Sequence, residues 1–272
     1  MALPIRPVPA RSAVLSLLLG CHPPALPVRD IVSAMELLGI SETTTRVAVS
    51  RMVAAGDLVG DGGEYALGKR LLERQRRQDA AVEPATRAWD GSWEVVVVTA
   101  TRRPAADRAA LRAELTALRL AELREGVWMR PANLDRQPPA HDRKTRVLVA
   151  RPVDDPAGLA EELWDLPAWA ADGRELLATA ARVDDPADRF AVMAATVRHL
   201  LTDPVLPPEL LPGDWPGPRL REIYAGYREE LSALLPTTSH GRTAGPASTR
   251  RIPTPPAPPS TASRRHTSKE TT

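Results

Sequence analysis

The most constraining feature of the sequence is the pattern of residues 28–67, where two short helices precede a tight hairpin. Apolar residues at 28, 31, 32, 35 and 38 repeat at the spacing of one helix face, and Gly39 ends this segment. Ser41 is a good N-cap for a second helix, which is expected to stop before Gly56. Two short strands follow around the turn "DGG". This order predicts a winged helix-turn-helix.

The exposed side of the second helix is suited to the major groove of DNA. The buried stripe is expected at Ala48, Val49, Met52 and Val53. Hydroxyls and N–H groups at a helix N-terminus can bind phosphate, and arginine can pair with the edge of guanine. The predicted DNA-binding residues are Ser41, Thr43, Thr44, Thr45, Arg46, Ser50 and Arg51. Alternatively, the threonines are ordinary caps and the arginines lie on a solvated face.

The hairpin and the segment after it differ in charge. The hairpin tip carries Asp61 and Glu64, whereas a wing that binds phosphate would be basic. Residues 68–81 are expected to form a charged helix that contains several cations, namely Lys69, Arg70, Arg74, Arg76 and Arg77. These cations either compensate for the acidic tip or form a solvated surface.

The middle of the chain predicts a small α+β domain. The run "VVVV" at residues 95–98 is typical of a buried strand, and residues 105–118 have the pattern of an amphipathic helix. Residues 126–131 and 145–153 predict further strands, followed by a helix that starts at Asp154-Asp155-Pro156. This order is typical of a ferredoxin-like βαββαβ domain.

Residues 166–235 are expected to be mainly helical, whereas the last segment is not. Residues 236–272 hold 7 proline and 14 serine or threonine residues. Such a segment cannot offset its own ordering entropy and is expected to be disordered. The expected organisation of this α+β protein is a disordered N-terminus (1–10), a winged helix-turn-helix (11–82), a ferredoxin-like domain (83–165), a C-terminal helical domain (166–235) and a disordered tail (236–272).

Composition narrows the class of protein. The formal net charge of +2 does not by itself call for a nucleic-acid partner. Cys21 is the single cysteine, so no disulfide can form within the chain. The longest apolar run, residues 13–20, is too short to span a bilayer. A cytoplasmic protein without membrane contact is therefore expected.

Five stretches resemble the PaaX-type transcriptional repressors, named for the phenylacetic acid degradation operon. They are "RSAVLSLLLG", "LLGISETTTRVAVSRMVAAGDLVG", "WDGSWEVVVV", "LREGVWMRP" and "DPVLPPELLPGDWPG", which together reach from Arg11 to about Leu235. The resemblance implies a homodimeric bacterial repressor that binds a palindromic double-stranded DNA operator near a catabolic promoter. It also implies a ferredoxin-like central domain and release from DNA by an aryl-CoA or other acyl-CoA effector.

Other kinds of chemistry find little support in the residues. The central domain also resembles a small CRISPR-associated nuclease, but the strand ends "VTAT" without the carboxylate that a metal-dependent nuclease needs. Cys21 and His22 are adjacent, and no second cluster has zinc spacing. We therefore expect no catalytic residue, no metal ligand and no cofactor. The paired acids before Pro156 and Pro186 fit helix caps better than catalysis.

Two groups of residues leave alternatives open for the effector site. Trp164, Trp169 and Trp215 either line an acyl pocket or pack in the core, and core packing is the expected role in an aromatic-poor chain. Arg143, Lys144 and Arg146 either meet a CoA phosphate or flank a strand. A different class also remains possible, in which the winged helix of a non-catalytic interaction module binds a protein partner.

Overall fold

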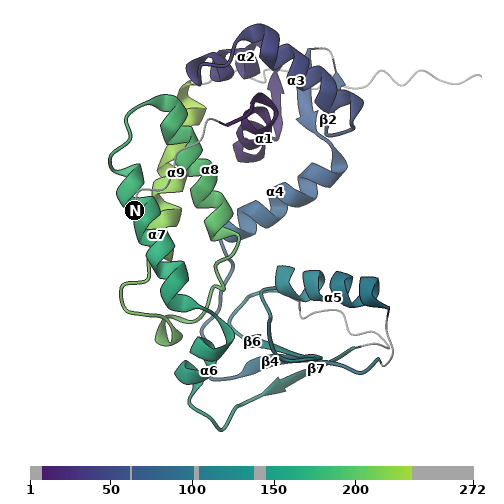
Figure 1. Cartoon of the computed structure of the whole chain (residues 1–272), viewed down its shortest axis with the longest axis vertical. Coiled ribbons are helices and arrows are strands. Elements are labelled where there is room, and N and C mark those ends of the chain that lie inside the picture. Colours follow the sequence, from purple (N-terminus) through teal and green to yellow (C-terminus); the bar gives the residue numbers. More distant parts are fainter. Residues whose placement is uncertain (1–7, 62, 101–103, 138–144, 235–272) are drawn as a thin grey trace, which may run out of the picture. The chain divides into compact units, whose positions relative to one another are not determined.

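The computed structural model describes residues 8–61, 63–100, 104–137 and 145–234 (Figure 1). Its mixture of helices with two small antiparallel sheets confirms the predicted α+β class. The predicted tail lies outside the described residues, and so does most of the predicted disordered N-terminus. None of the described helices combines the length and the apolar character that crossing a bilayer requires.

The N-terminal part has the predicted order of helix, turn, helix and hairpin. Its elements are α1 (Ala10–Gly20), β1 (Ala25–Pro27), α2 (Val28–Leu37), α3 (Glu42–Ala54), β2 (Leu58–Asp61) and β3 (Glu64–Leu67). The sequence pattern did not predict β1, which pairs antiparallel with β3 and completes a sheet of order β1-β3-β2. The wing is therefore anchored to the segment that enters α2.

Local signals set both ends of α3. The Ser41 side chain accepts a hydrogen bond of 3.3 Å from the Thr44 N–H and so caps the first turn. Gly56, just after the helix, has φ of +70°, a conformation that glycine adopts without strain. The predicted apolar stripe is wrong at Val53, whose side chain is exposed, because the buried face is centred one turn earlier and includes Thr45.

Asp57 ties α3 to α1 and to the following helix, α4 (Lys69–Val82). Its carboxylate is 2% exposed and accepts hydrogen bonds from Arg11 and from Arg70, the latter at 2.5 Å. The hydrogen bond from Arg11, followed by that from Arg70, holds the pKa of Asp57 below its ordinary value. The corner between α3 and the wing is therefore held by charge-assisted bonds as well as by apolar packing.

Replacing Asp57 with asparagine is expected to lower the free energy of unfolding at pH 7 by about 1–2 kcal/mol, because two charge-assisted bonds to exposed arginines are lost. The pKa of Asp57 is lowered by folding, so its contribution is complete above the unfolded value near 3.9 and disappears as the pH falls through the folded pKa. Urea denaturation of the wild type and of Asp57→Asn between pH 7 and pH 3 measures how the difference in their free energies of unfolding depends on pH.

The matched control for Asp57 is Glu73→Gln, which removes an exposed carboxylate paired with Arg76 at 2.9 Å. This control should change the free energy of unfolding by less than about 0.5 kcal/mol. A difference between wild type and Asp57→Asn that stayed constant down to the lowest pH would show that the carboxylate charge is not responsible.

The central sheet has the strand arrangement expected for a ferredoxin-like domain. Its elements are β4 (Trp93–Val98), α5 (Ala105–Ala117), β5 (Ala121–Arg124), β6 (Val127–Pro131) and β7 (Thr145–Ala150). The sheet order is β5-β6-β4-β7, and β4 and β5 both run antiparallel to β6 between them, as in a split βαβ unit. One detail differs from βαββαβ: residues 132–137 of the β6–β7 connection contain no helix, and α6 (Pro156–Leu163) follows β7.

The two faces of this sheet have different covers because successive side chains of a strand point to opposite sides. Val96 and Trp128 pack with Leu115 of α5 on one face. Trp93 and Met129 pack on the other face with α6 and with the segment that contains η1 (Pro208–Leu210). The central domain is thus continuous with the chain that follows it.

Three helices of the second half of the chain begin after an aspartate, with a proline at one of the first two helical positions. The remaining helices are α7 (Leu166–Ala180), α8 (Pro186–Leu200) and α9 (Gly217–Leu234). Asp155, Asp165 and Asp185 accept hydrogen bonds from N–H groups in the first turns of α6, α7 and α8. The interpretation of the paired acids as helix caps is therefore confirmed.

Helix α4 belongs to two hydrophobic clusters. Near its start, Leu71 is buried in the winged-helix core with α1 and α3. At its end, Ala81 and Val82 pack with α7, α8 and α9. Figure 1 shows α4 running from the winged helix-turn-helix toward α8. Phe190 of α8, 4% exposed, completes the contact by packing in the winged-helix core.

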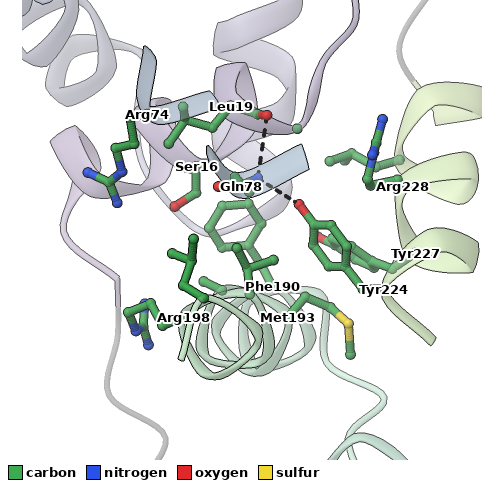
Figure 2. Close-up of a pocket in the computed structure, with 15 residues that line it drawn as sticks. Ser16, Leu19, Arg74, Gln78, Phe190, Met193, Arg198, Tyr224, Tyr227 and Arg228 are labelled. Carbon is green, nitrogen blue, oxygen red and sulfur yellow. Dashed lines mark hydrogen bonds between the residues drawn. The ribbon is translucent and has the colours of Figure 1, made fainter. Parts of the chain in front are cut away.

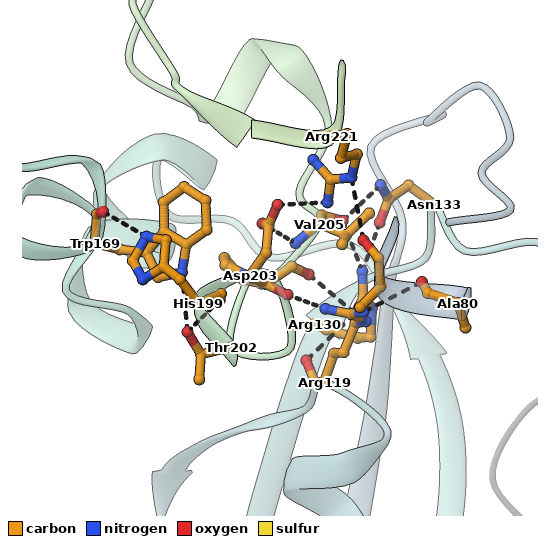
Figure 3. A network of polar contacts seen from close by, with 12 residues as sticks. Ala80, Arg119, Arg130, Asn133, Trp169, His199, Thr202, Asp203, Val205 and Arg221 are labelled. Atoms are coloured by element: carbon orange, nitrogen blue, oxygen red, sulfur yellow. Dashed lines mark hydrogen bonds and ion pairs between the residues drawn. The ribbon is translucent and has the colours of Figure 1, made fainter. Parts of the chain in front are cut away.

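A buried polar network joins the central sheet to residues 203–205 (Figure 3). Arg130 of β6 is fully buried and donates to Asn133 at 2.8 Å and to the Val205 carbonyl at 3.1 Å. Burial lowers the pKa of Arg130 to about 9. Asp203, 1% exposed, accepts from Arg221 of α9 at 2.6 Å and from the Val205 N–H at 2.8 Å. Two of the family-like stretches therefore contact each other here.

Candidate nucleic-acid interface

Most of the predicted DNA-binding residues lie on the open side of α3. The exposed ones are Ser41, Thr43, Thr44, Arg46, Ser50 and Arg51. Ala48, Val49 and Met52 on the opposite side are buried in the winged-helix core. The exposed side therefore consists of small hydroxyls at the N-terminus and arginines further along, a composition that allows close approach to a groove.

Thr45 is a correction to the predicted set. Its side chain is 0% exposed, and its hydroxyl has no hydrogen-bond partner in the part of the chain that the structure describes. Thr45 lies one turn before Ala48 and Val49, so the helical repeat places it on the inner face. The Thr45 side chain therefore lies on the buried side of α3 and is not available to DNA in this conformation.

The two arginines of α3 differ in their surroundings. Arg46 donates to Glu42, one turn earlier, at 2.7 Å, and both side chains are more than half exposed. Such an exposed pair contributes only about 0.3–0.5 kcal/mol, so a phosphate could replace the carboxylate. Arg51 makes no ion pair or hydrogen bond with any described residue. It is therefore the cation of α3 that is free to take an anion directly.

The N-terminus of α3 has hydroxyls that already serve the helix. The Ser41 hydroxyl lies 2.9 Å from the Thr44 hydroxyl and also accepts from the Thr44 N–H. The capping role of Ser41 is therefore clear, and its contact with DNA stays a prediction. Glu42, also in the first turn, places a carboxylate at the end where the helix dipole favours an anion.

The wing and α4 add a mixed set of side chains. Val59 of β2 is 59% exposed, whereas Glu64 is half-buried. On α4, Arg70 is bound to Asp57 and Arg76 to Glu73. Arg74 and Arg77 have no acidic partner among the described residues. Free positive charge thus lies on α4 rather than on the described part of the wing.

The tryptophans predicted as alternatives for an acyl pocket pack in the core. Trp169 stacks on Trp215 with ring centroids 4.3 Å apart and on His199 at 4.1 Å. Trp164 lies in a different cluster, against the central sheet. The core-packing interpretation is therefore confirmed. Of the basic residues weighed with them, Arg146 lies on β7, whereas Arg143 and Lys144 lie outside the described residues.

Cys21 and His22 make contacts that do not resemble a metal site. One ring nitrogen of His22 lies 3.1 Å from Asp79 and the other 3.0 Å from Arg228. Burial raises the pKa of the Cys21 thiol to about 11, which disfavours the thiolate that a metal would bind. Within the described ranges, no three His, Cys, Asp or Glu side chains are grouped so that they could hold a metal.

Sequence patterns did not reveal the residues that join distant elements. Arg130 lies in a family-like stretch, but its burial against Val205 is a tertiary contact. Arg74 of α4 and Arg198 of α8 line one pocket beside Phe190, which the sequence did not single out. The one available signal was that Phe190 is the only phenylalanine of the chain.

Comparisons with known proteins cover most of the chain. Family models match residues 9–71 (PaaX-like protein), 86–148 (PaaX protein central Cas2-like domain) and 164–237 (PaaX-like protein C-terminal domain). A solved structure, the uncharacterized protein Rv0674 from Mycobacterium tuberculosis, is similar at 50% sequence identity with a TM-score of 0.73. The similarity covers 82% of this chain and 96% of that one. No curated protein matched the chain.

Proposed function

Since the chain belongs to the PaaX family of transcriptional regulators, we propose that it represses a catabolic operon, such as one for phenylacetate, and is released by an aryl-CoA or other acyl-CoA thioester. Its place of action is then the cytoplasm, where the operator DNA lies. The observation that carries this proposal is the open side of α3, with Thr43, Thr44, Ser50 and Arg51 exposed over a buried apolar stripe.

In the proposed complex, α3 lies in the major groove and its N-terminus faces the phosphates. The first-turn N–H groups and the hydroxyls of Thr43 and Thr44 donate to phosphate oxygens, assisted by the helix dipole. Arg51 pairs with a guanine edge or a phosphate, and Arg46 does so after leaving Glu42. Arg74 and Arg77 add positive charge beside the wing.

A homodimer is part of the proposal, because a two-fold protein matches a palindromic operator with one reading helix for each half-site. The edge strand β7 supports it. Leu148 and Val149 on this strand are 53% and 74% exposed, and Val153 just beyond it is fully exposed. Exposed apolar side chains on an edge strand are typical of a contact with another chain.

Replacing Arg51 or Arg46 with alanine is expected to weaken binding to a selected operator by about 1–3 kcal/mol each if the arginine pairs with a base. Operator fragments are first selected from a random duplex library, and the dissociation constants are then measured by fluorescence anisotropy over a range of salt concentrations. An arginine that contacts only phosphate should instead reduce the slope of log K against log salt by about 1.

The matched control is Arg182→Ala, which removes an exposed arginine just after α7, paired with Glu175 at 3.7 Å, without touching α3. This control changes the net charge by the same amount and should leave operator affinity within about twofold. Operator binding that is unchanged in both Arg51→Ala and Arg46→Ala would remove α3 from the interface. Wild-type binding that is insensitive to salt would favour a protein partner over DNA.

A further inference from the structure

A pocket lies where the winged helix-turn-helix meets the C-terminal helices. It is formed by α1, α4, α8 and α9 and is open to solvent, with a cavity volume of about 50 Å³, or about 570 Å³ when the solvent space at its mouth is counted. Figure 2 shows Phe190 and Met193 of α8 on its floor, with Tyr224 and Tyr227 of α9 on one side. Gln78 of α4 closes the inner end by donating to the Tyr224 hydroxyl at 3.1 Å.

The opposite side of the pocket is cationic. Arg74 of α4 and Arg198 of α8 both line it and both lack an acidic partner among the described residues (Figure 2). Burial lowers the pKa of Arg74, and the charges of Arg77 and Arg198 lower it further. The other charges that act on Arg74, those of Arg70 and Arg11, are also positive. Two arginines that repel each other beside a partly desolvated site are stabilised by an anion.

The rest of the lining is apolar or already engaged. Phe190, Met193 and Val197 present apolar surface, and Leu19 adds to it from α1. Arg228, at the far side, is bonded to His22 at 3.0 Å and is less available. A ligand that matches this distribution has an anionic group at one end and a compact apolar group at the other.

We propose that this pocket binds a small organic anion with an aryl or short acyl group, its anionic end between Arg74 and Arg198 and its apolar end against Phe190 and Met193. A free carboxylic acid carries its charge next to the apolar group, whereas a CoA thioester carries it on phosphates at the other end of the molecule, so the two sources are tested separately. The assignment of the pocket as the effector site rests on the proposed function. Its position supports that role, because the ligand would contact α1 and α4 of the DNA-binding part and α8 and α9 of the C-terminal part at once.

The regulatory consequence follows from differential binding. A ligand shifts an equilibrium between two arrangements only if it binds one more tightly. Phe190 is both a wall of the pocket and a member of the winged-helix core, so a change at the pocket alters the packing beneath α1. The ligand therefore acts on the element that joins the two parts rather than on α3 itself.

The test measures the binding of phenylacetyl-CoA, phenylacetate and CoA to the full chain by isothermal titration calorimetry. We expect phenylacetyl-CoA or phenylacetate to bind, and CoA alone to bind at least about tenfold more weakly than the better of the two, because it lacks the apolar group. The double variant Arg74→Gln/Arg198→Gln should weaken that binding by at least about tenfold. Arg74→Lys/Arg198→Lys, which keeps the charges, should retain more affinity than the glutamine variant.

Two controls separate the pocket from folding and from DNA binding. Arg76→Gln, on the same helix but paired with Glu73, should change ligand affinity by less than about twofold. Ala194→Leu, which fills the pocket without removing a charge, should weaken ligand binding while circular dichroism remains that of the wild type. Each variant is also titrated with operator DNA in the absence of ligand.

The outcomes are distinct for the two proposals. If no probe binds, or if the double glutamine variant and Ala194→Leu both bind a probe as well as wild type, the pocket is not the site. If the glutamine variant loses only DNA affinity, its arginines serve phosphate contacts and the pocket proposal fails. If the wild type binds a probe through this pocket but no DNA, the repressor proposal fails while the pocket stands.

Discussion

Replacing Asp203 with asparagine is expected to lower the free energy of unfolding by about 3–5 kcal/mol, because a buried charge pair loses one partner. The Asp203 carboxylate is buried and pairs with Arg221, which is 18% exposed. Arg119 also donates to the Asp203 carbonyl, and its charge lies close by (Figure 3). Without the carboxylate, these half-buried arginines have no compensating negative charge in the network that Figure 3 shows.

Asparagine is chosen because it preserves the shape of the site and can still accept from the Val205 N–H. The effect therefore reports the loss of charge rather than a cavity. Guanidinium denaturation followed by circular dichroism measures the free energy of unfolding. Asp214→Asn is the matched control, since Asp214 is 70% exposed and pairs with Arg174 at 2.7 Å on the surface.

The control should cost less than about 1 kcal/mol, as exposed pairs do. A loss below about 1 kcal/mol for Asp203→Asn as well would mean that water reaches the network and screens it. The double variant Asp203→Asn/Arg221→Met separates the pair from its surroundings. It should recover part of the loss, because one of the uncompensated arginines is removed along with its partner.

Replacing Phe190 with alanine is the second substitution for which we expect a large effect. It should lower the free energy of unfolding by about 3–5 kcal/mol. Phe190 is 4% exposed and packs from α8 into the core formed by α1, α2 and α3. Phe190 also lines two pockets, one beside Arg74 and one beside Met35. Truncation would leave a cavity that the backbone cannot close fully.

Phe190→Leu provides the matched comparison, because leucine keeps apolar volume at the same position and should cost less than half as much. Urea denaturation of both variants measures the difference. Equal stability of Phe190→Ala and wild type would show that the winged helix-turn-helix does not depend on α8. In that case, the coupling proposed between the pocket and the DNA-binding part would lose its physical basis.

Several parts of the fold follow from signals that act over a few residues. Ser41 caps α3, Gly56 ends it, and Gly63, with φ of +92°, allows the tight turn of the hairpin. The alternating run of β4 supplies Trp93 and Val95 to one face of the sheet and Val96 to the other. Each of these features depends on neighbours in the chain, so the pattern of the sequence is enough to predict it.

The candidate DNA-binding face was predictable to a similar extent, with one residue misplaced. Periodicity alone separates exposed Arg51 from buried Met52, because they are neighbours that the helix turns to different sides. The same repeat puts Thr45 on the inner face, but a polar residue in the first turn was expected to be exposed, and the structure buries it where α3 packs against α1. The central domain was identified in the same way, except that the sequence pattern did not predict β5.

By itself, the sequence determined the helices, the wing, three of the central strands (β4, β6 and β7) and the side of α3 that remains open, because caps, turns and apolar repeats act between residues close in the chain. Only the tertiary structure decided that Asp57 meets Arg11, that Asp203 meets Arg221 and that Arg74 and Arg198 line one pocket beside Phe190. These contacts join residues far apart in the chain. Their geometry depends on how whole elements pack, and no local pattern encodes that.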